Sequence, residues 1–239
     1  TEAIKGFNWM ISNQNTDGSW YNLYDDQDPL ELNKQTNYSS YLAVATWHFY
    51  LLNNDINFLK NHWEPLKEGI LFSLNLQNDN GAIAWNIDDK GDIDDDYLLT
   101  GCSSIAKSLE CAIAICQILG HKSIEKEWRI AHAKLIRAIE NPTGIFDLKK
   151  DRSRFSMDSY YPIIGGITSK NIVSSLMSNI KTSFWIKGLG IKCVSDEPWI
   201  TVAETSECSI AFKKMGEDEI ALELLHNAIA IVDCRSIPY

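Results

Sequence analysis

The chain alternates between helical segments that are apolar on all sides and segments that are apolar on one side only. Residues 38–52 contain no Asp, Glu, Lys or Arg, and residues 100–119 are almost as apolar. Each is followed, after a short polar break, by an amphipathic segment, at residues 57–77 and 123–140. A helix that is apolar all round is buried, whereas an amphipathic helix keeps one face in water. The pattern therefore predicts inner helices covered by outer helices.

A short motif ends each amphipathic segment. It consists of Gln or Glu, then Gly four residues later, then an aromatic residue. The copies are Gln14-x-x-x-Gly18 with Trp20, Gln77-x-x-x-Gly81 with Trp85, and Glu140-x-x-x-Gly144 with Phe146. Successive copies lie 63 residues apart. Gly adopts the left-handed conformation that ends a helix at little steric cost, so the spacing predicts a helical hairpin that repeats along the chain.

The polar connections between the predicted helices have two lengths. Short breaks near residues 53–55 and 120–122 lead from an inner helix to an outer one. Long loops at residues 15–37 and 79–99 lead from an outer helix to the next inner one. The long loops therefore gather at one rim, beside the N-termini of the inner helices. Loops and free backbone N–H groups at such a rim are where we expect a site.

The remaining segments are also predicted to be largely helical, with helices at residues 2–14, 169–181, 201–214 and 217–232. Two concentric helix layers joined in this way form an α/α toroid. We therefore predict an all-α fold, a partial six-hairpin barrel built from helical hairpins with a 63-residue period. We expect residues 1–239 to form a single domain that is incomplete at its N-terminus.

Composition narrows the classes of partner. The net charge is −10 and no basic stripe is visible, which argues against binding to nucleic acid. No apolar run approaches about 18 residues, so we expect no membrane span. The six cysteines show no metal-ligand spacing, and no cofactor motif is evident. Buried free thiols are the simplest interpretation, which favours a cytoplasmic location. The sequence does not indicate an oligomeric state.

The predicted rim loops are rich in carboxylates and aromatic side chains. Paired carboxylates beside aromatic platforms suit a sugar substrate, because one acid can protonate the glycosidic oxygen while a base activates water. We therefore expect a small-molecule substrate, most simply a sugar. The candidate substrate-binding residues are Trp20, Trp85, Tyr160, Tyr161, Trp199 and Glu207.

Asp158 and Glu204 are the preferred catalytic pair because both stand among apolar residues. Desolvation should raise the pKa of Asp158 toward that of a general acid. Glu204 falls in the first turn of a predicted inner helix, where the helix dipole favours its charged form, as a base requires. The alternative is structural, with either residue capping a helix or pairing with Arg152, Arg154 or Lys192.

Two family resemblances are visible. Gln14-x-x-x-Gly18-x-Trp20 resembles the repeat motif of terpenoid cyclases and prenyltransferase-like α/α toroids. Residues 45–50, followed by Asp55, Phe58, Trp63 and Leu66, are similar to the second hairpin of six-hairpin glycosidases of the glucoamylase kind. The whole chain also resembles uncharacterised bacterial proteins described as prenyltransferase-like. Both resemblances imply a toroid, and a complete toroid needs more helices than this sequence predicts.

The glycosidase resemblance implies an acid just before the inner helix that begins at Thr100. Residues 92–96, ending in Asp96, occupy that place, although the Trp-Glu-Glu context of that family is absent. The base would then be Glu197 or Glu204. This makes a glycoside hydrolase-like protein our first functional prediction.

Two alternatives stay open. Asp92-Ile93-Asp94-Asp95 resembles the Asp-x-Asp-Asp motif of class II terpene cyclases, but Asp96 stands where that family has Thr. A terpenoid or prenyl-diphosphate enzyme, with Mg²⁺ on the Asp cluster, is therefore the second hypothesis. A non-catalytic sugar-binding or scaffold toroid is the third.

Overall fold

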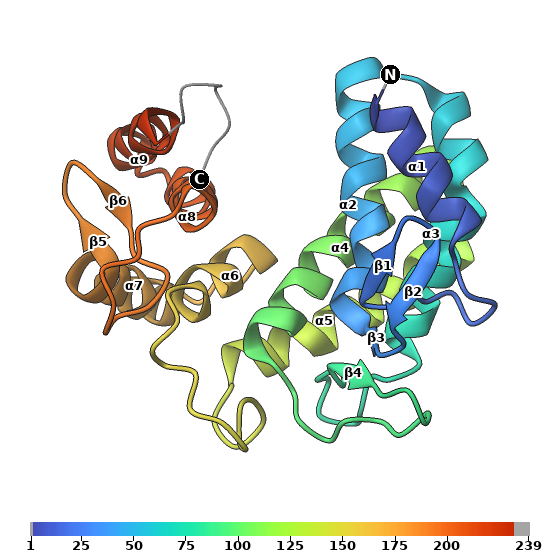
Figure 1. The fold of residues 1–239 in the computed structure, drawn as a ribbon, viewed down its shortest axis with the longest axis horizontal. Helices are drawn as coiled ribbons and strands as arrows, with labels where there is room; N and C mark the ends of the chain where they lie inside the picture. The colour runs from blue at the N-terminus through green and yellow to red at the C-terminus, as the bar shows by residue number, and fades with distance from the viewer. Residues whose placement is uncertain (1, 232–239) are drawn as a thin grey trace. The chain divides into compact units, whose positions relative to one another are not determined.

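The computed structural model describes residues 2–231, and most of these residues are helical (Figure 1). The chain divides into two compact units, Thr1–Leu148 and Lys149–Tyr239. Each unit has its own buried core. The expectation of a single domain over residues 1–239 stays a prediction.

The first unit contains five helices among its described residues. They are α1 (Glu2–Ser12), α2 (Thr36–Asn53), α3 (Ile56–Leu74), α4 (Leu99–Leu119) and α5 (Lys122–Glu140). Its short strands are β1 (Leu23–Asp25), β2 (Asp28–Glu31), β3 (Lys34–Gln35) and β4 (Asn86–Ile87). They pair antiparallel, β1 with β2 and β3 with β4, and so tie down the long loops.

The second unit begins with helix α6 (Met157–Gly165) and helix α7 (Lys170–Asn179). The π-helical turn η1 (Ile180–Phe184) leads into an antiparallel pair, β5 (Trp185–Ile186) and β6 (Gly190–Ile191). Helices α8 (Val202–Lys214) and α9 (Asp218–Ala230) complete the unit. The helix predicted at residues 217–232 corresponds to α9, and its expected last residue lies outside the described residues.

Helix α4 is the core of the first unit, as its apolar sequence predicted. It packs against α2, α3 and α5, and its central residues Ile105, Ala106 and Leu109 are at most 1% exposed. Among residues 2–231, α4 is the one helix that is long and apolar enough to cross a membrane, and 67% of that stretch is buried inside the fold. A helix that is buried on most sides in a core is expected to be apolar all round, as α4 is.

The first inner helix departs from the prediction. Helix α2 packs against α3 and α4, but Tyr38, Tyr41, Leu51 and Leu52 are exposed. The expectation that this segment is buried on most sides is therefore only partly correct. In the second unit, α6 was not predicted at all, because Pro162 and two adjacent glycines interrupt its helical pattern.

The repeated Gln-x-x-x-Gly motif joins successive outer helices. The Gln14 side-chain amide donates to the Gly18 carbonyl at 2.9 Å and to the Pro65 carbonyl in α3 at 2.8 Å. One repeat later, the Gln77 amide donates to the Gly81 carbonyl at 2.9 Å and to the Ala131 carbonyl in α5 at 3.0 Å. The two copies make the same contacts, which confirms that the motif is a structural repeat.

The glycine of the first two copies permits a close approach between helices. Gly18 and Gly81 have φ of +87° and +97°. A Cβ on Gly18 would overlap the carbonyl of Glu68 in α3, and a Cβ on Gly81 would overlap the carbonyl of Lys134 in α5. In the third copy, Gly144 has φ of +75°, but a Cβ there would meet nothing within 4 Å.

This difference predicts a graded loss of stability. Gly144→Ala should lower the free energy of unfolding by about 1–2 kcal/mol through backbone strain alone. Gly81→Ala should lower it by about 3 kcal/mol or more, since the same strain is added to a steric overlap. Urea-induced unfolding followed by tryptophan fluorescence would measure both. Equal losses in the two variants would contradict the proposed close approach at Gly81.

Candidate functional site

Helices α6 and α8 of the second unit pack against each other. Their C-terminal ends meet where Lys214 donates to the Ile164 carbonyl at 2.9 Å, and Tyr160 reaches Glu207 nearer their starts, so their N-terminal turns lie at the same end. The segment between β6 and α8 links those turns. The Ser156 amide, which precedes α6, donates to the Cys193 carbonyl at 2.9 Å. The side-chain oxygen of Thr201 caps α8 by accepting from the Glu204 amide at 3.2 Å. Asp158 and Glu204 are therefore both in first turns at this end of the unit.

Glu207 is held by two phenols from α6. The Tyr160 hydroxyl donates to its Oε2 and the Tyr161 hydroxyl to its Oε1, each at 2.9 Å. Tyr160 is fully buried. Burial, reinforced by the Glu207 and Glu204 carboxylates, raises the pKa of Tyr160 far above its usual range. The phenol therefore stays protonated, and Glu207 is fixed in one orientation.

Glu204 lies one turn before Glu207, on the same face of α8. It is 8% exposed and hydrogen-bonds the thiol of Cys193. Burial, followed by this carboxylate, raises the pKa of Cys193 to about 11, so the neutral thiol is the donor. The first two turns of α8 thus hold two carboxylates on one helix face.

Asp158 is half-buried and lies one turn before Tyr161 on α6. Residues three apart share a helix face, so Asp158 is on the face of α6 from which Tyr161 reaches Glu207. The sequence-based pair, Asp158 and Glu204, therefore comes from two helices that pack together at one end. We call Asp158, Tyr160, Tyr161, Cys193, Glu204 and Glu207 the α6–α8 acid cluster.

Glu197 and Trp199 lie in the segment that precedes α8. Glu197 is half-buried in a hollow of about 490 Å³, whose other lining residues are Ile186, Leu189, Lys192, Ser195, Asp196, Pro198 and Ile200. Asp196 itself pairs with Arg154 at 2.9 Å. Trp199 is 58% exposed, so its ring is available for stacking, as a sugar platform requires.

The candidate site residues of the first unit, Asp96 and Trp85, are more buried than their positions in loops suggested. Asp96 is buried, its amide donates to Asp94 Oδ1 at 3.0 Å, and its own Oδ1 accepts from the Tyr97 amide at 3.1 Å. These bonds fold the acidic run into tight turns. Trp85 is half-buried, and its carbonyl accepts from the Thr36 amide at the start of α2.

Two predicted substrate platforms require correction. Trp20 is 3% exposed and its indole N–H donates to the Met10 carbonyl at 2.7 Å, so it is a core residue that packs over the end of α1. The ring of Tyr160 is equally inaccessible, and its hydroxyl positions Glu207 instead. An aromatic residue after a helix-ending glycine can pack inward as well as outward, and the sequence does not distinguish the two.

Cys193 was not among the predicted site residues, because nothing in its local sequence distinguishes it from the buried cysteines. The five described cysteines are free, and all but Cys193 are buried; Cys234 lies outside the described residues. Within residues 2–231, no group of three or more His, Cys, Asp or Glu side chains could hold a metal ion.

Comparison with known proteins gives one curated relative. The chain is 33% identical over 215 residues to an MMP endo-(1,4)-3-O-methyl-alpha-D-mannosidase of Mycolicibacterium hassiacum. The match covers 90% of this chain and 58% of the relative, so the chain spans little more than half of that protein. No protein-family model matches the chain.

Solved structures identify the fold. A rhamnosidase from Klebsiella oxytoca with rhamnose bound matches 86% of this chain and 40% of its own, with a TM-score of 0.61 and 11% identity. An alpha-amylase from Clostridium perfringens matches 95% of this chain and 68% of its own, with a TM-score of 0.65 and 12% identity. The chain has an α/α-toroid fold of the glycosidase kind. The all-α prediction is thereby confirmed.

The contact between Cys193 and Glu204 predicts the reactivity of the thiol. With a pKa of about 11, Cys193 at pH 8.5 should carry roughly 100-fold less thiolate than an ordinary cysteine and alkylate correspondingly slowly. Glu204→Gln removes the charge that helps raise this pKa. The pKa should then fall, and iodoacetamide labelling should become roughly three- to tenfold faster.

Burial remains in that variant, so the thiol should still react more slowly than a free cysteine. Peptide mass spectrometry in a Cys234→Ser background would follow Cys193 alone. Glu207→Gln is the matched control, because Glu207 is bonded to the two tyrosines rather than to Cys193. Equal acceleration in both variants would argue against a direct Cys193–Glu204 contact.

Proposed function

We propose that the protein is a glycoside hydrolase that acts on α-(1,4)-linked mannosides, including 3-O-methylated ones. The observation that carries the proposal is the α6–α8 acid cluster. Asp158 and Glu204 occupy the first turns of two packed helices, and Glu207 is oriented by two phenol hydroxyls. The curated relative, named for action on 3-O-methyl-α-D-mannosides, supplies the substrate class. The exposed ring of Trp199 supports a sugar substrate.

In the proposed reaction, Asp158 is the general acid and Glu204 the general base. Asp158 gives its proton to the glycosidic oxygen as the bond to the anomeric carbon breaks. Glu204 takes a proton from the water that attacks that carbon. Inverting enzymes hold such a pair about 6.5–9.5 Å apart so that water fits between. Asp158 and Glu204 occupy the first turns of α6 and α8, two helices that pack together.

Glu207 has a positioning role in this proposal. Both of its oxygens accept phenol hydrogen bonds, so it is poorly placed to exchange protons with a substrate. Its charge lies one turn from Glu204 on the same helix face. Tyr160 and Tyr161 hold the Glu207 carboxylate, and the Cys193 thiol contacts Glu204.

The glycosidase resemblance offers Asp96 as the acid and Glu197 as the base, and both remain open as proposals. Asp96 is buried and its carboxylate accepts from the backbone amide of Tyr97, which favours a structural role. Glu197 is half-buried in an open hollow and could reach a ligand there. Variants of both residues therefore belong in any test of the site.

The terpenoid alternative requires a deep aromatic pocket with an acid at its base. The apolar hollow of the first unit is lined by Ala3, Gly6, Phe7, Trp9, Met10, Tyr41, Leu42 and Ala45, without a carboxylate. That lining does not favour cyclase chemistry, and similarity to prenyltransferase-like bacterial proteins stays a prediction. A cytoplasmic location is likewise a proposal, supported by the free cysteines.

Activity should depend on the proposed acid and base. Asp158→Asn and Glu204→Gln should each lower kcat by about 10²–10⁴-fold on α-(1,4)-manno-oligosaccharides, because each removes one proton transfer. The release of reducing ends, with and without 3-O-methyl groups on the substrate, would measure this. An α-(1,4)-gluco-oligosaccharide of equal length tests specificity for the sugar.

Controls separate the competing assignments. Asp96→Asn and Glu197→Gln should retain most activity, and all four variants should keep a melting temperature near that of the parent. Loss of turnover in Asp96→Asn together with an active Glu204→Gln would move the chemistry to the first unit. A parent protein that neither hydrolyses nor binds any of these sugars would overturn the proposed function.

A further inference from the structure

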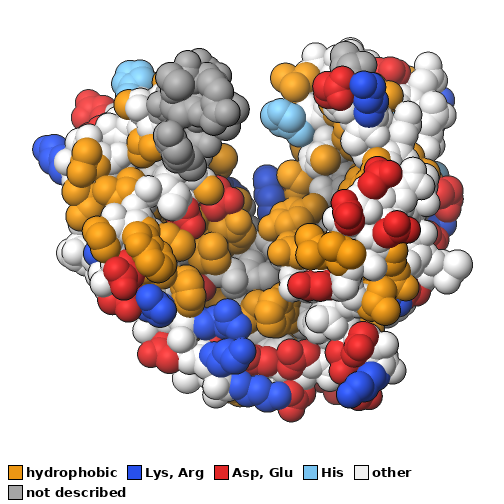
Figure 2. All heavy atoms as spheres, viewed as in Figure 1, with side chains coloured by type: hydrophobic (Ala, Val, Ile, Leu, Met, Phe, Trp, Pro, Cys, Tyr) orange, Lys and Arg blue, Asp and Glu red, His pale blue; other side chains and the backbone are white. Residues whose placement is uncertain are grey.

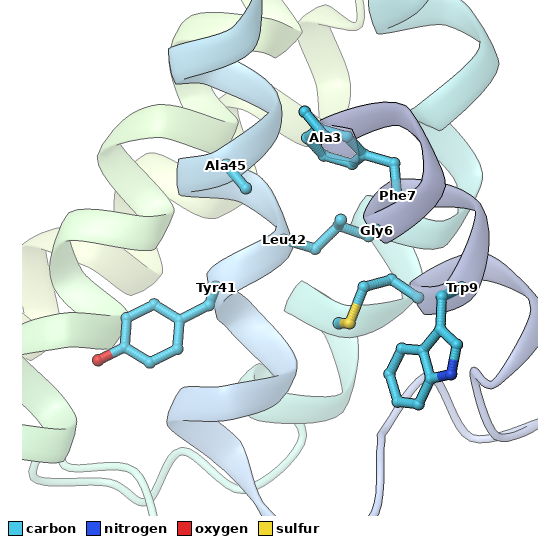
Figure 3. A pocket seen from close by; sticks show the side chains of 8 residues that line it. Ala3, Gly6, Phe7, Trp9, Tyr41, Leu42 and Ala45 are labelled. Carbon is cyan, nitrogen blue, oxygen red and sulfur yellow. The ribbon is translucent and has the colours of Figure 1, made fainter. Parts of the chain in front are cut away.

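The first unit has an apolar hollow of about 470 Å³ between α1 and α2 (Figure 3). Gly6 and Met10 line it from α1, and Leu42 and Ala45 line it from α2, with Leu42 pointing toward Gly6. Hydrophobic side chains are also exposed on the surface over α2 in the space-filling view (Figure 2). We call this feature the α1–α2 hollow.

The hairpin repeat shows what fills the equivalent place one repeat later. The motif glycines Gly18 and Gly81 align α1 with α3, and Thr36 and Thr100, which lie 64 residues apart at the starts of α2 and α4, align these two helices. The groove between α3 and α4 is not hollow, because α2 packs against both helices. Ile70, Ala106 and Leu109, the counterparts of the lining residues Phe7, Leu42 and Ala45, are at most 1% exposed.

Gly6 is the most informative residue of the hollow. Its counterpart in α3 is Gly69, where a Cβ would overlap the carbonyl of Ser39 in α2. Gly69 is therefore the point at which an inner helix touches an outer one. Gly6 is exposed in the interior of α1, and a Cβ there would meet nothing within 4 Å. A glycine in a helix interior destabilises the helix unless something requires the missing side chain.

The outward face of α2 also differs from its counterpart one repeat later. Tyr38, Tyr41, Ala45 and His48 are exposed and lie on one face by their spacing. Their counterparts in α4, Cys102, Ile105, Leu109 and Ala112, are at most 1% exposed. One repeat later, this helix face is therefore fully covered.

We infer that the α1–α2 hollow is the docking groove of a further inner helix, supplied by the same polypeptide and placed before α1. Every complete hairpin has this order, with the inner helix first. Residues 54–55 join α2 to α3, residues 120–121 join α4 to α5, and residues 215–217 join α8 to α9. The docked helix is apolar on most sides and brings its backbone against Gly6, as α2 does at Gly69.

The substitution Gly6→Ala tests this inference by a change of sign. In the 239-residue chain, Gly6→Ala should raise Tm by about 2–4 °C, because alanine favours the helix and meets no neighbour. In a polypeptide extended to include all residues that its gene encodes upstream, the same substitution should lower Tm. Gly69→Ala is the matched control and should lower Tm in both.

Hydrogen exchange provides a second measurement. Amides of α1 should exchange at least tenfold more slowly in the extended polypeptide, while those of α4 should be unchanged. A gene without upstream coding residues, or an extended polypeptide in which Gly6→Ala still raises Tm, would overturn the inference. So would a 239-residue chain that dimerises and loses its dimer on Gly6→Ala, since the occupant would then be a second copy.

Discussion

The structure depends on the close approach of helix ends to neighbouring helices. A helix that ends in Gln-x-x-x-Gly presents a backbone without a side chain, and the next outer helix places a carbonyl against it. The glutamine then donates to that same helix, so one motif sets both the distance and the register of neighbouring hairpins. Because the contact is made by backbone and amide groups, the rest of each helix can vary while the spacing of the hairpins is kept.

The α6–α8 acid cluster illustrates why such a scaffold suits polar chemistry. A buried carboxylate is costly unless hydrogen bonds compensate for lost water. Glu207 receives two phenol hydroxyls, and Glu204 receives a thiol whose pKa is raised by burial and by the carboxylate itself. The donors come from α6 and from the segment before α8, so packing of the second unit is what holds both acids in place.

Sequence pattern predicted those parts of the structure that depend on local rules. The glycine spacing and the apolar character of residues 100–119 identified the repeat and the core helix, since both follow from helix geometry and burial. Helix α6 was missed because Pro162 obscures its periodicity. The roles of Trp20 and Tyr160 were misassigned because exposure depends on which helix packs over a ring, which no local pattern records. The donors to Glu204 and Glu207 come from 11 or more residues away in sequence, beyond the range of a local pattern.

The two groups of acids in this chain show how environment separates candidate catalytic residues from structural ones. In the acidic run before α4, Asp88, Asp94 and Asp96 accept from nearby backbone amides. Glu204 and Glu207 obtain their partners from other segments, and those partners exist only when the unit is folded. A carboxylate that is oriented by the tertiary structure can be placed against a substrate. A carboxylate that accepts from the backbone of its own turn already has its hydrogen-bond partner in the loop.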